Sequence, residues 1–417
     1  MTPQPARLAP DMTDPTEFDD VIAWASGPLP PEVERKARLL LLDGIACIAA
    51  GLRHAEVRAL GGALGIWFPG EVTLPGAETR LGPAGAAALG AAAMCWDEAN
   101  EGLAMAHGRP GLPVIPAVLA LSRPLPERLR ALVLGYEVGA RAGQIWRIRP
   151  GMHVDGSWHA LGAAAACALL TGADPADAIR LAACQIPFSL YRPIAFGMTG
   201  RNSYPAHAAL LGALSAAASA AGMKAPEGSL DEARRLALLK DTPAVRAAAG
   251  AWLILDAYIK PFAAVRHTHY AAAAAIALRD RVEVSSITAI RLTTYAEALR
   301  YAGNRAPTAP ISAQFSLSFA VAAGLLLGDL GPDATSHLDH PELRRLEQLV
   351  ELVEDPAMTE RAAHVTIETP RGAVSIRIDS VPGDLSTPMS EADIVAKFRR
   401  YAGHLPEAEA ILGDMLG

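Results

Sequence analysis

Alanine-rich runs with apolar residues at helical spacing recur through the first 258 residues of this 417-residue chain. Gly or Pro separates many of the runs, and both residues favour helix ends and starts. Hydrophobic residues make up 51% of the sequence but aromatic residues only 5%, and Ala both favours helix and lets helix axes approach closely. We therefore expect a bundle of packed helices, with helical segments at residues 31–52, 84–93, 126–142, 160–170, 175–185, 206–221 and 243–258.

The pattern changes after Lys260, where some segments alternate apolar with polar and β-branched residues, as half-buried strands do. One of these segments is interrupted by Pro370-Arg371-Gly372, which is typical of a hairpin turn. Because 417 residues exceed the usual size of one core, we expect a second, smaller α+β domain over residues 260 to about 382. Its strands are expected at 287–295 and 364–379 and its helices at 312–327 and 340–354, and a last helical segment at 390–416 could pack back on the first domain.

Composition excludes several classes of partner. The formal net charge is -7 and the charges are interspersed, so no basic stripe is available for nucleic acid. The apolar runs are too short to span a bilayer, and residues 1–18 are expected to form a disordered lead and not a signal peptide. The four cysteines are scattered without CxxC spacing, which suits a reducing compartment. We expect a soluble, cytoplasmic protein without a membrane partner.

Four polar segments interrupt the apolar chain, and because burying a polar group without a partner is costly, each requires a reason. The first runs from Trp96 to Gly111, where a helix closes into a Gly/Pro-rich loop. Asp97 and His107 could form a carboxylate–imidazole pair, in which the carboxylate fixes the tautomer and the imidazole moves a proton. A capped helix end with a loop histidine is the alternative interpretation.

The second and third segments each lie directly before an expected helix. His153 precedes the helix at 160–170, where free backbone N–H groups and the helix dipole favour an anion such as a carboxylate. Arg201 can clamp a carboxylate with two hydrogen bonds, and Tyr204 can supply a phenolic proton. A loop packed by its own side chains is the alternative for His153, and a solvated arginine is the alternative for Arg201.

The fourth segment, from Tyr258 to His269, lies at the expected domain junction. Junctions favour small-molecule pockets because two domains can close over a ligand. Lys260 could transfer protons if burial lowers its pKa, and Arg266 and His267 could hold a carboxylate; an interdomain polar contact is the alternative. The sequence contains no HExxH motif, phosphate-binding glycine motif or GxSxG motif, so we expect no metal and no phosphate-bearing cofactor.

These segments resemble those of the MmgE/PrpD family, which includes 2-methylcitrate dehydratase, cis-aconitate decarboxylase and iminodisuccinate epimerase. The resemblance runs from about residue 20 to residue 397 and depends on several segments in the family's order, not on a single motif. The matching segments are Asp43–Gly51, Trp96–His107, Gly151–His153 with the alanine-rich helix after it, Lys260-Pro261-Phe262 with His269, Ala313–Phe319, and Gly383–Met389 with Lys397.

The resemblance implies a mainly α protein in which a helical domain of residues 1–259 is completed by residues 383–417. Residues 260–382 would form an α+β lid, the protein would be a homodimer, and the active site would lie between the domains without a metal or organic cofactor. The residues that we assign to catalysis are Asp97, His107, His153, Lys260 and Tyr204, and those that we assign to substrate binding are Arg201, Arg266, His267, His269 and Glu101.

The chain departs from the family pattern at four of its positions. Glu101 replaces a hydroxyl-type residue, and Tyr204 occupies what is often a histidine position. Arg201 stands where lysine is usual, and because a guanidinium keeps its proton at working pH, Arg201 can clamp but not act as a base. Phe319 lies where the decarboxylases place a tyrosine, which removes a candidate proton donor. These changes argue against cis-aconitate decarboxylation.

The expected chemistry is formation or protonation of a carbanion or enediolate beside a carboxylate, which needs cationic groups, a base and an acid. Within this class we expect a lyase that dehydrates a β-hydroxy acid on a small di- or tricarboxylate, as 2-methylcitrate dehydratase does. The first alternative is an epimerase of an α-substituted dicarboxylate. The second alternative is a homologue that binds a carboxylate without catalysis.

Overall fold

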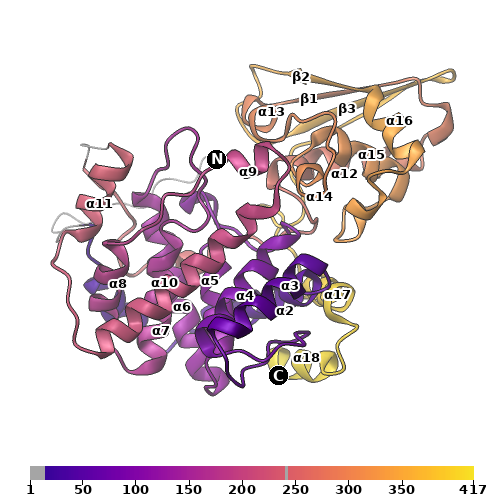
Figure 1. Cartoon of the computed structure of the whole chain (residues 1–417). Helices are drawn as coiled ribbons and strands as arrows, with labels where there is room; N and C mark the ends of the chain where they lie inside the picture. The colour runs from indigo at the N-terminus through magenta and orange to yellow at the C-terminus, as the bar shows by residue number, and fades with distance from the viewer. Residues whose placement is uncertain (1–14, 240–242) are drawn as a thin grey trace.

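The computed structural model describes residues 15–239 and 243–417, and over these residues the protein is mainly α-helical with one four-stranded sheet (Figure 1). Buried apolar side chains form two large clusters. We call the part that forms the first cluster, residues 18–263 and 394–415, the helical body. We call the part that forms the second, residues 264–381, the mixed part. The α-helices of the helical body are α1 (Asp19–Ala25), α2 (Pro31–Gly51), α3 (Ala55–Trp67), α4 (Pro83–Trp96), α5 (Gly111–Ala120), α6 (Leu125–Ile145), α7 (His159–Thr171), α8 (Pro175–Ala183), α9 (Arg192–Ala195), α10 (Tyr204–Ala220), α11 (Ser229–Leu238), α17 (Glu391–Ala402) and α18 (Ala408–Leu416).

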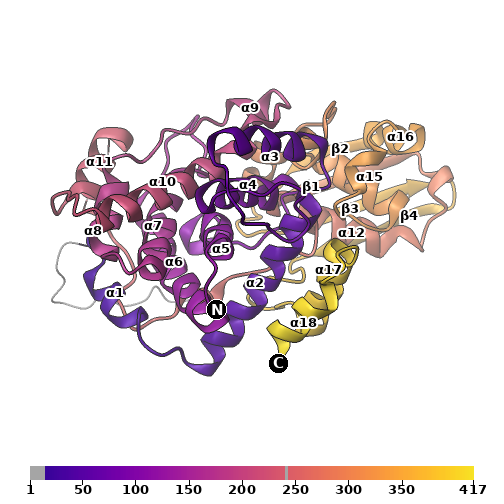
Figure 2. The same cartoon turned by 60° about the horizontal axis from the view of Figure 1, so that its bottom comes forward.

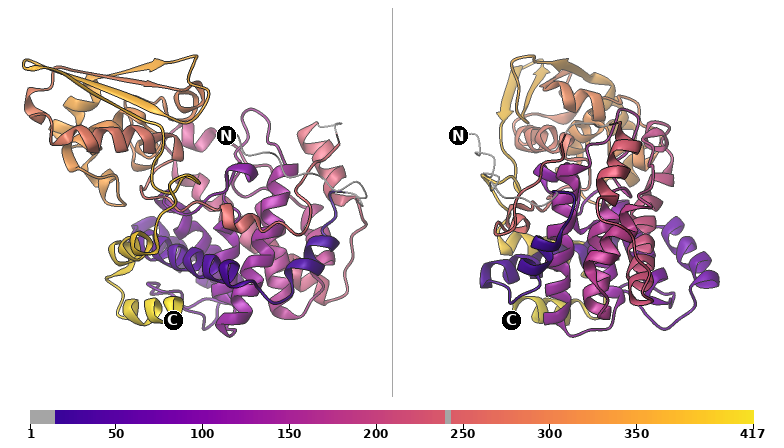
Figure 3. Two further views of the ribbon diagram at one scale, coloured as in Figure 1. Left: turned by 180° about the vertical axis from the view of Figure 1, so that it is seen from behind. Right: turned by 90° about the vertical axis from the view of Figure 1, so that its left-hand side faces the viewer.

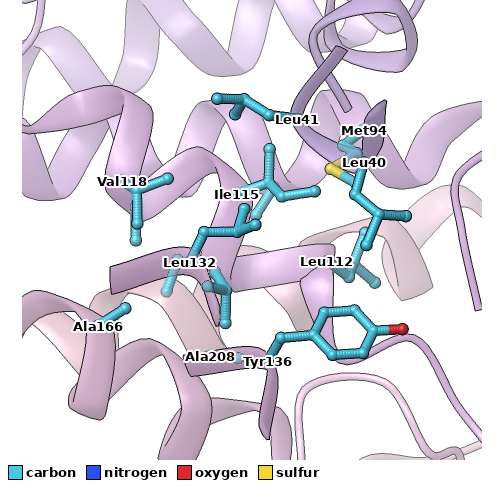
Figure 4. Packing of buried hydrophobic residues seen from close by; sticks show 14 of the residues in the cluster. Leu40, Leu41, Met94, Leu112, Ile115, Val118, Leu132, Tyr136, Ala166 and Ala208 are labelled. Atoms are coloured by element: carbon cyan, nitrogen blue, oxygen red, sulfur yellow. The ribbon is translucent and has the colours of Figure 1, made fainter. Parts of the chain in front are cut away.

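Helix α7 lies at the centre of the helical body and packs against α5, α6 and α10. The glycines explain how closely these helices approach: a Cβ atom added to Gly135 of α6 or Gly162 of α7 would collide with the backbone of the other glycine. Figure 4 shows side chains of α2, α4, α5 and α6, among them Leu41, Ile115 and Leu132, gathered in the apolar core beside these crossings. The alanine- and glycine-rich composition therefore sets the helix spacing.

The last two helices return to the helical body and lie beside α2 (Figure 2). A buried ion pair holds this contact, because the ammonium of Lys397 on α17 contacts the carboxylate of Asp43 on α2 at 2.5 Å. The Lys397 ammonium also donates to the carbonyl of Ala99 at 2.7 Å. The C-terminal segment is thus part of the first core, although more than 300 residues separate the paired side chains.

The mixed part packs α12 and α15 together on one side of a sheet, at one end of the molecule (Figure 3). The sheet has the order β2-β1-β3-β4, in which β1 runs parallel to β2 and antiparallel to β3. Ile290, Leu292, Val365 and Ile367 are fully buried and belong to the second cluster. The elements of the mixed part are α12 (His269–Arg279), β1 (Ala289–Thr294), α13 (Ala296–Ala302), α14 (Pro310–Ala313), α15 (Leu317–Leu327), α16 (Pro341–Leu349), β2 (Val350–Glu354), β3 (Ala363–Thr369) and β4 (Gly372–Ile378).

The expected helix at 243–258 is wrong. This segment is extended and irregular apart from one 3-10 turn, η3 (Leu253–Asp256). Its backbone groups bond to side chains of α6: Arg141 donates to the carbonyls of Ala247 and Ala251, and Glu137 accepts from the N–H of Ile254 at 2.9 Å. Tertiary hydrogen bonds replace the helical ones, so the helical propensity of the segment is overridden.

Two other expectations need correction. The expected helix at 340–354 ends at Leu349, and the remaining residues form β2, which pairs with β1 at the edge of the sheet. The expected disordered lead ends earlier than residue 18, since Phe18 is buried and Arg246 donates to the carbonyls of Pro15 and Glu17; residues 1–14 lie outside the described residues. Among the described helices, none has the length and apolar character needed to cross a membrane.

Candidate functional site

Five charged side chains converge where the helical body meets the mixed part, and none is more than 7% exposed. We call Glu98, Arg109, Asp155, Arg201 and Lys260 the charged cluster. The two parts of the molecule touch beside it, because Gln314 donates to the carbonyl of Trp96 at 3.0 Å and the ring of Phe315 lies 5.5 Å from the guanidinium of Arg201. The cluster therefore lies at the seam between the two cores.

Glu98 is the centre of the charged cluster. Its carboxylate lies 3.1 Å from Arg109 Nη1, 2.5 Å from Arg201 Nη2 and 3.0 Å from Lys260 Nζ, and its carbonyl accepts from the same ammonium at 2.7 Å. Asp155 forms the second anionic point, since its Oδ2 contacts the guanidinium of Arg109 and lies 3.4 Å from that of Arg201. One network thus joins residues that are up to 162 positions apart.

Local backbone geometry places these side chains. Glu98 follows the end of α4 in a left-handed conformation with φ 54°, which is strained for a residue with a Cβ. Asp155 lies in the loop before α7, and Arg201 lies in the 3-10 turn η2 (Thr199–Ser203) before α10. Lys260 follows an antiparallel bridge between Tyr258 and Gly102, which holds the junction segment against the loop after α4.

The charges of the cluster do not balance. Burial alone would raise the pKa of Glu98, but Arg109, Arg201 and Lys260 outweigh it and hold the pKa well below its usual range. Arg109 and Arg201 likewise hold the pKa of Asp155 below its usual range, against the effect of burial. Both carboxylates are therefore ionised, and three cations face two anions. Burial lowers the pKa of Lys260, with Glu98 opposing the shift. The cluster thus holds one positive charge too many, and the lysine is the cation that can give up a proton.

His153 lies against the charged cluster. Its Nδ1 accepts the N–H of Asp155 at 3.0 Å, so its neutral form carries the proton on Nε2. Burial lowers the pKa of His153 to about 4, with Asp155 opposing and the guanidinium of Arg201 reinforcing the shift. The nearby His159 is fully buried, and its Nε2 lies 4.0 Å from Oδ1 of Asp155. Burial lowers its pKa to about 3, so both imidazoles are neutral at pH 7.

The expected pair of Asp97 with His107 is wrong. The carboxylate of Asp97 is buried and contacts Nε2 of His54 at 2.8 Å, and among the described residues its second oxygen has no hydrogen-bond partner. His107 is exposed, lies in a left-handed conformation after a 3-10 turn, and does not enter the charged cluster. Desolvation by the surrounding protein, with the charges of Arg147 and Arg361, lowers the pKa of His107 to about 4.

Two further candidates lie behind or beside the charged cluster. Glu101 is fully buried, where its carboxyl group accepts the N–H of Gly111 and the hydroxyl of Tyr136, both at 3.0 Å. Burial raises the pKa of Glu101 to about 7. Tyr204 donates its hydroxyl to the carbonyl of Leu190 at 3.0 Å, and its ring centre lies 6.1 Å from that of His153. Neither residue bonds to the cluster in this arrangement.

The candidates after Lys260 make a second set of contacts, apart from the charged cluster. Arg266 pairs with Asp384 at 2.5 Å and donates to Nδ1 of His269, whose Nε2 in turn donates to the carbonyl of Ala264 at 3.0 Å. These bonds satisfy both ring nitrogens of His269 and give it a structural position. His267 instead contacts the hydroxyl of Tyr295 through Nδ1 at 2.7 Å.

The segments predicted from the sequence meet in the charged cluster, but several residues of the cluster were not predicted. Glu98, Arg109 and Asp155 lie within two residues of Asp97, His107 and His153, and no pattern in the sequence ranks one neighbour above the other. Phe319 was compared with a tyrosine of the decarboxylases, yet it is buried in the second core, and Phe315 is the aromatic residue that faces Arg201.

Cys95 contacts Arg109 and Arg201 of the charged cluster, and a thiol beside two carboxylates could in principle bind a metal. Cys95, Glu98 and Asp155 are the one set of three potential ligands found close together in the described residues, with ligand atoms within 4.8 Å of one another. The guanidiniums of Arg109 and Arg201 contact all three of these groups. A cation here would face two fixed positive charges at its own ligands, so the donor set does not fit a metal ion.

Comparison with known proteins gives both individual relatives and matching family domains. Curated relatives include cis-aconitate decarboxylase of Aspergillus terreus and the same enzyme of its strain NIH 2624 / FGSC A1156, each 30% identical over 169 residues. That similarity covers 37% of this chain and about a third, 34%, of the relative's length. The sequence also matches the MmgE/PrpD N-terminal domain over residues 21–239 and the MmgE/PrpD C-terminal domain over residues 262–413. Together these two domains span most of the sequence, and the chain belongs to the MmgE/PrpD family.

Proposed function

We propose that this protein is a lyase that dehydrates a β-hydroxy acid carrying two or three carboxylates. The observation that carries the proposal is the unbalanced charged cluster, in which three buried cations face two carboxylates beside the neutral imidazole of His153. A buried excess of positive charge favours an anion, and the name of the related cis-aconitate decarboxylase indicates that this relative acts on a carboxylate.

The proposed reaction divides the work between His153 and Lys260. The neutral imidazole of His153 removes the proton from the carbon beside a carboxylate through Nδ1, after the bound substrate displaces the N–H of Asp155 from that nitrogen. The pKa of His153 rises as the substrate's negative charge arrives. The enediolate that forms is stabilised by the excess positive charge around Glu98. The protonated amine of Lys260 delivers its proton to the β-hydroxyl, which leaves as water while the carbon–carbon double bond forms. Arg201 keeps its proton throughout and binds charge only.

The burial of the charged cluster supports the presence of a lid that opens. The charged cluster is almost fully buried, and its cover comes from the mixed part through Gln314 and Phe315. We propose that residues 260–382 act as a lid over residues 1–259 and 383–417, and that the parts separate to admit substrate.

Exposed apolar side chains support self-association. Phe188, Leu190, Phe196 and Met198 lie close together in sequence around α9 and are 45–61% exposed. Exposed apolar patches of this kind are common at protein interfaces. We propose that this segment contributes to a homodimer, and that the protein works in the cytoplasm.

The test uses a panel of β-hydroxy di- and tricarboxylates, including citrate and 2-methylcitrate. A dehydratase forms a double bond conjugated to a carboxylate, which is followed by ultraviolet absorbance. His153→Ala should lower kcat by about 100-fold or more, because general acid–base groups contribute about that much. His207→Ala is the control, since His207 is an exposed histidine on α10.

Two other results would replace the proposal. Incorporation of solvent deuterium into recovered substrate, without an unsaturated product, would identify an epimerase. Binding of the acids with neither turnover nor deuterium incorporation would identify a carboxylate-binding homologue without catalysis.

A further inference from the structure

Arg361 is a cation without a partner at the seam between the two parts. It lies in the connection between β2 and β3, two residues before the start of β3 at Ala363. Within the described residues its guanidinium forms no hydrogen bond and no ion pair, although its side chain is half-buried. Other arginines at this seam are all engaged, as Arg109 and Arg201 are by carboxylates of the cluster and Arg266 is by Asp384. Because the guanidinium of Arg361 has no partner among the described residues, its N–H groups are available to bind an anion.

The backbone places Arg361 beside a set of polar groups that face the helical body. Ala363, at the start of β3, pairs with Thr294 at the end of β1, and Thr294 donates to the carbonyl of Ala362 at 2.8 Å. The next residue, Tyr295, contacts Nδ1 of His267 through its hydroxyl at 2.7 Å. Arg361, Tyr295 and His267 are therefore neighbours across the end of the sheet.

The charge of Arg361 reaches both parts of the molecule. Burial is the main cause that lowers the pKa of His267 to about 3, and the charge of Arg361 is the second. The charge of Lys260 acts in the same direction. It also contributes to the lowered pKa of His107, which belongs to the helical body. Glu297 is the carboxylate whose charge is felt at Arg361, but it is exposed and not within ion-pair distance. The other groups that act on Arg361 are the hydroxyls of Tyr258, Tyr295 and Tyr270, so among the described residues no carboxylate is paired with its charge.

His267 adds a hydrogen-bond donor to this charge. Burial raises the pKa of Tyr295, so its hydroxyl is protonated and donates to Nδ1 of His267. A neutral imidazole that accepts at Nδ1 carries its proton on Nε2. In the described residues no hydrogen-bond acceptor is bound to that nitrogen. The N–H of His267 and the guanidinium of Arg361 therefore form two donors without an acceptor, which is the complement of a carboxylate.

We propose that Arg361, with His267, binds the substrate carboxylate that is remote from the charged cluster, and so selects di- and tricarboxylates over monocarboxylates. The inference rests on the proposed function and deepens it. One carboxylate lies beside the carbon that reacts, near Glu98, Arg201 and Lys260. The second carboxylate reaches the mixed part, so closing the lid on the substrate pairs the free charge of Arg361.

The test is isothermal titration of the full-length protein with tricarballylate, a tricarboxylate that has no hydroxyl to eliminate. Arg361→Gln should weaken binding by about 10- to 100-fold, because a hydrogen-bonded charge pair is lost. Arg361→Lys keeps the charge but loses the planar fork, and its affinity should fall between the two. Arg371→Gln is the matched control, since Arg371 is an exposed arginine of the same part, in the turn between β3 and β4.

The outcomes separate this inference from the proposed function. Affinity of Arg361→Gln equal to that of Arg371→Gln would overturn the role of Arg361 and leave the dehydratase proposal in place. If Arg361→Gln has a lowered Tm, its weaker binding could come from lost stability, and the Arg361→Lys variant is then the test. Unchanged affinity in Arg361→Lys would overturn the proposal that the planar guanidinium of Arg361 binds the carboxylate. If the wild-type protein neither binds tricarballylate nor converts any acid of the panel, the proposed function fails and the assignment of Arg361 fails with it.

Discussion

Two of the buried ion-pair systems of the protein, both of which include a lysine, differ in charge balance. Lys397 and Asp43 form a one-to-one pair between α17 and α2, with the carbonyl of Ala99 as a further acceptor. The charged cluster around Glu98 instead joins three cations to two carboxylates and lies beside His153. A balanced pair needs nothing further, whereas an unbalanced cluster is completed by another anion. Charge balance, and not burial, therefore distinguishes a structural ion pair from a candidate binding site.

The largest expected effect comes from breaking the balanced pair. Lys397→Met should lower the free energy of unfolding by about 3–5 kcal/mol, because it leaves the carboxyl group of Asp43 buried without its partner. Lys260→Met is the matched variant in the charged cluster. It should cost only about 1–2 kcal/mol, since Arg109 and Arg201 still compensate Glu98, but it should abolish turnover.

Urea unfolding of both variants, measured beside activity, checks this contrast. Equal losses of stability in the two lysine variants would mean that the charged cluster is a structural network like the first pair. A double variant Asp43→Leu/Lys397→Met provides the control, because it removes both charges and should recover much of the loss.

The next prediction concerns the pH dependence of the free energy of unfolding, which arises from the histidines beside the charged cluster. The pKa of His153 is about 4 in the folded protein and near 6.5 when unfolded, so the unfolded chain binds more protons between these values. Stability is therefore full above about pH 6.5 and falls as the pH decreases towards 4, by about 3 kcal/mol for His153 alone. His159, with a pKa of about 3, adds to the loss over a wider range.

Unfolding by urea at pH 7.0, 5.5 and 4.5 measures this slope. His153→Asn should flatten it, because the amide oxygen can still accept the N–H of Asp155 but does not titrate. An unchanged slope in His153→Asn would show that His153 is not neutral in the folded protein, and the base assigned to the reaction would be lost.

The sequence predicts more of the fold than of the site. Helices such as α2, α4 and α6 are confirmed because Ala, Leu and Gly at helical spacing decide both propensity and packing. The segment at 243–258 fails because Arg141 and Glu137 of α6 bond its backbone, and nothing within the segment signals these partners.

The site could be located by segment but not by residue. His153, Arg201 and Lys260 were identified and lie together, because polar residues at helix starts and at a junction are few in so apolar a chain. The choice of Asp97 over Glu98 was wrong for the cluster, since a strained φ of 54° turns Glu98 towards the cations. Arg361 was missed because an unpaired charge is defined by its surroundings, which the sequence does not display.

The smallest expected effect concerns the rim of the seam. Arg53, after α2, pairs with Asp333 of the mixed part at 3.1 Å, and both side chains are about half exposed or more. An exposed pair of this kind contributes about 0–0.5 kcal/mol, so Arg53→Gln should leave Tm unchanged within error. If residues 260–382 open to admit substrate, weak contacts at the rim are what opening requires, since each ion pair there must break and reform in every turnover. A large loss of stability in Arg53→Gln would mean that the two parts are locked together, and the proposed lid would then have no means of opening.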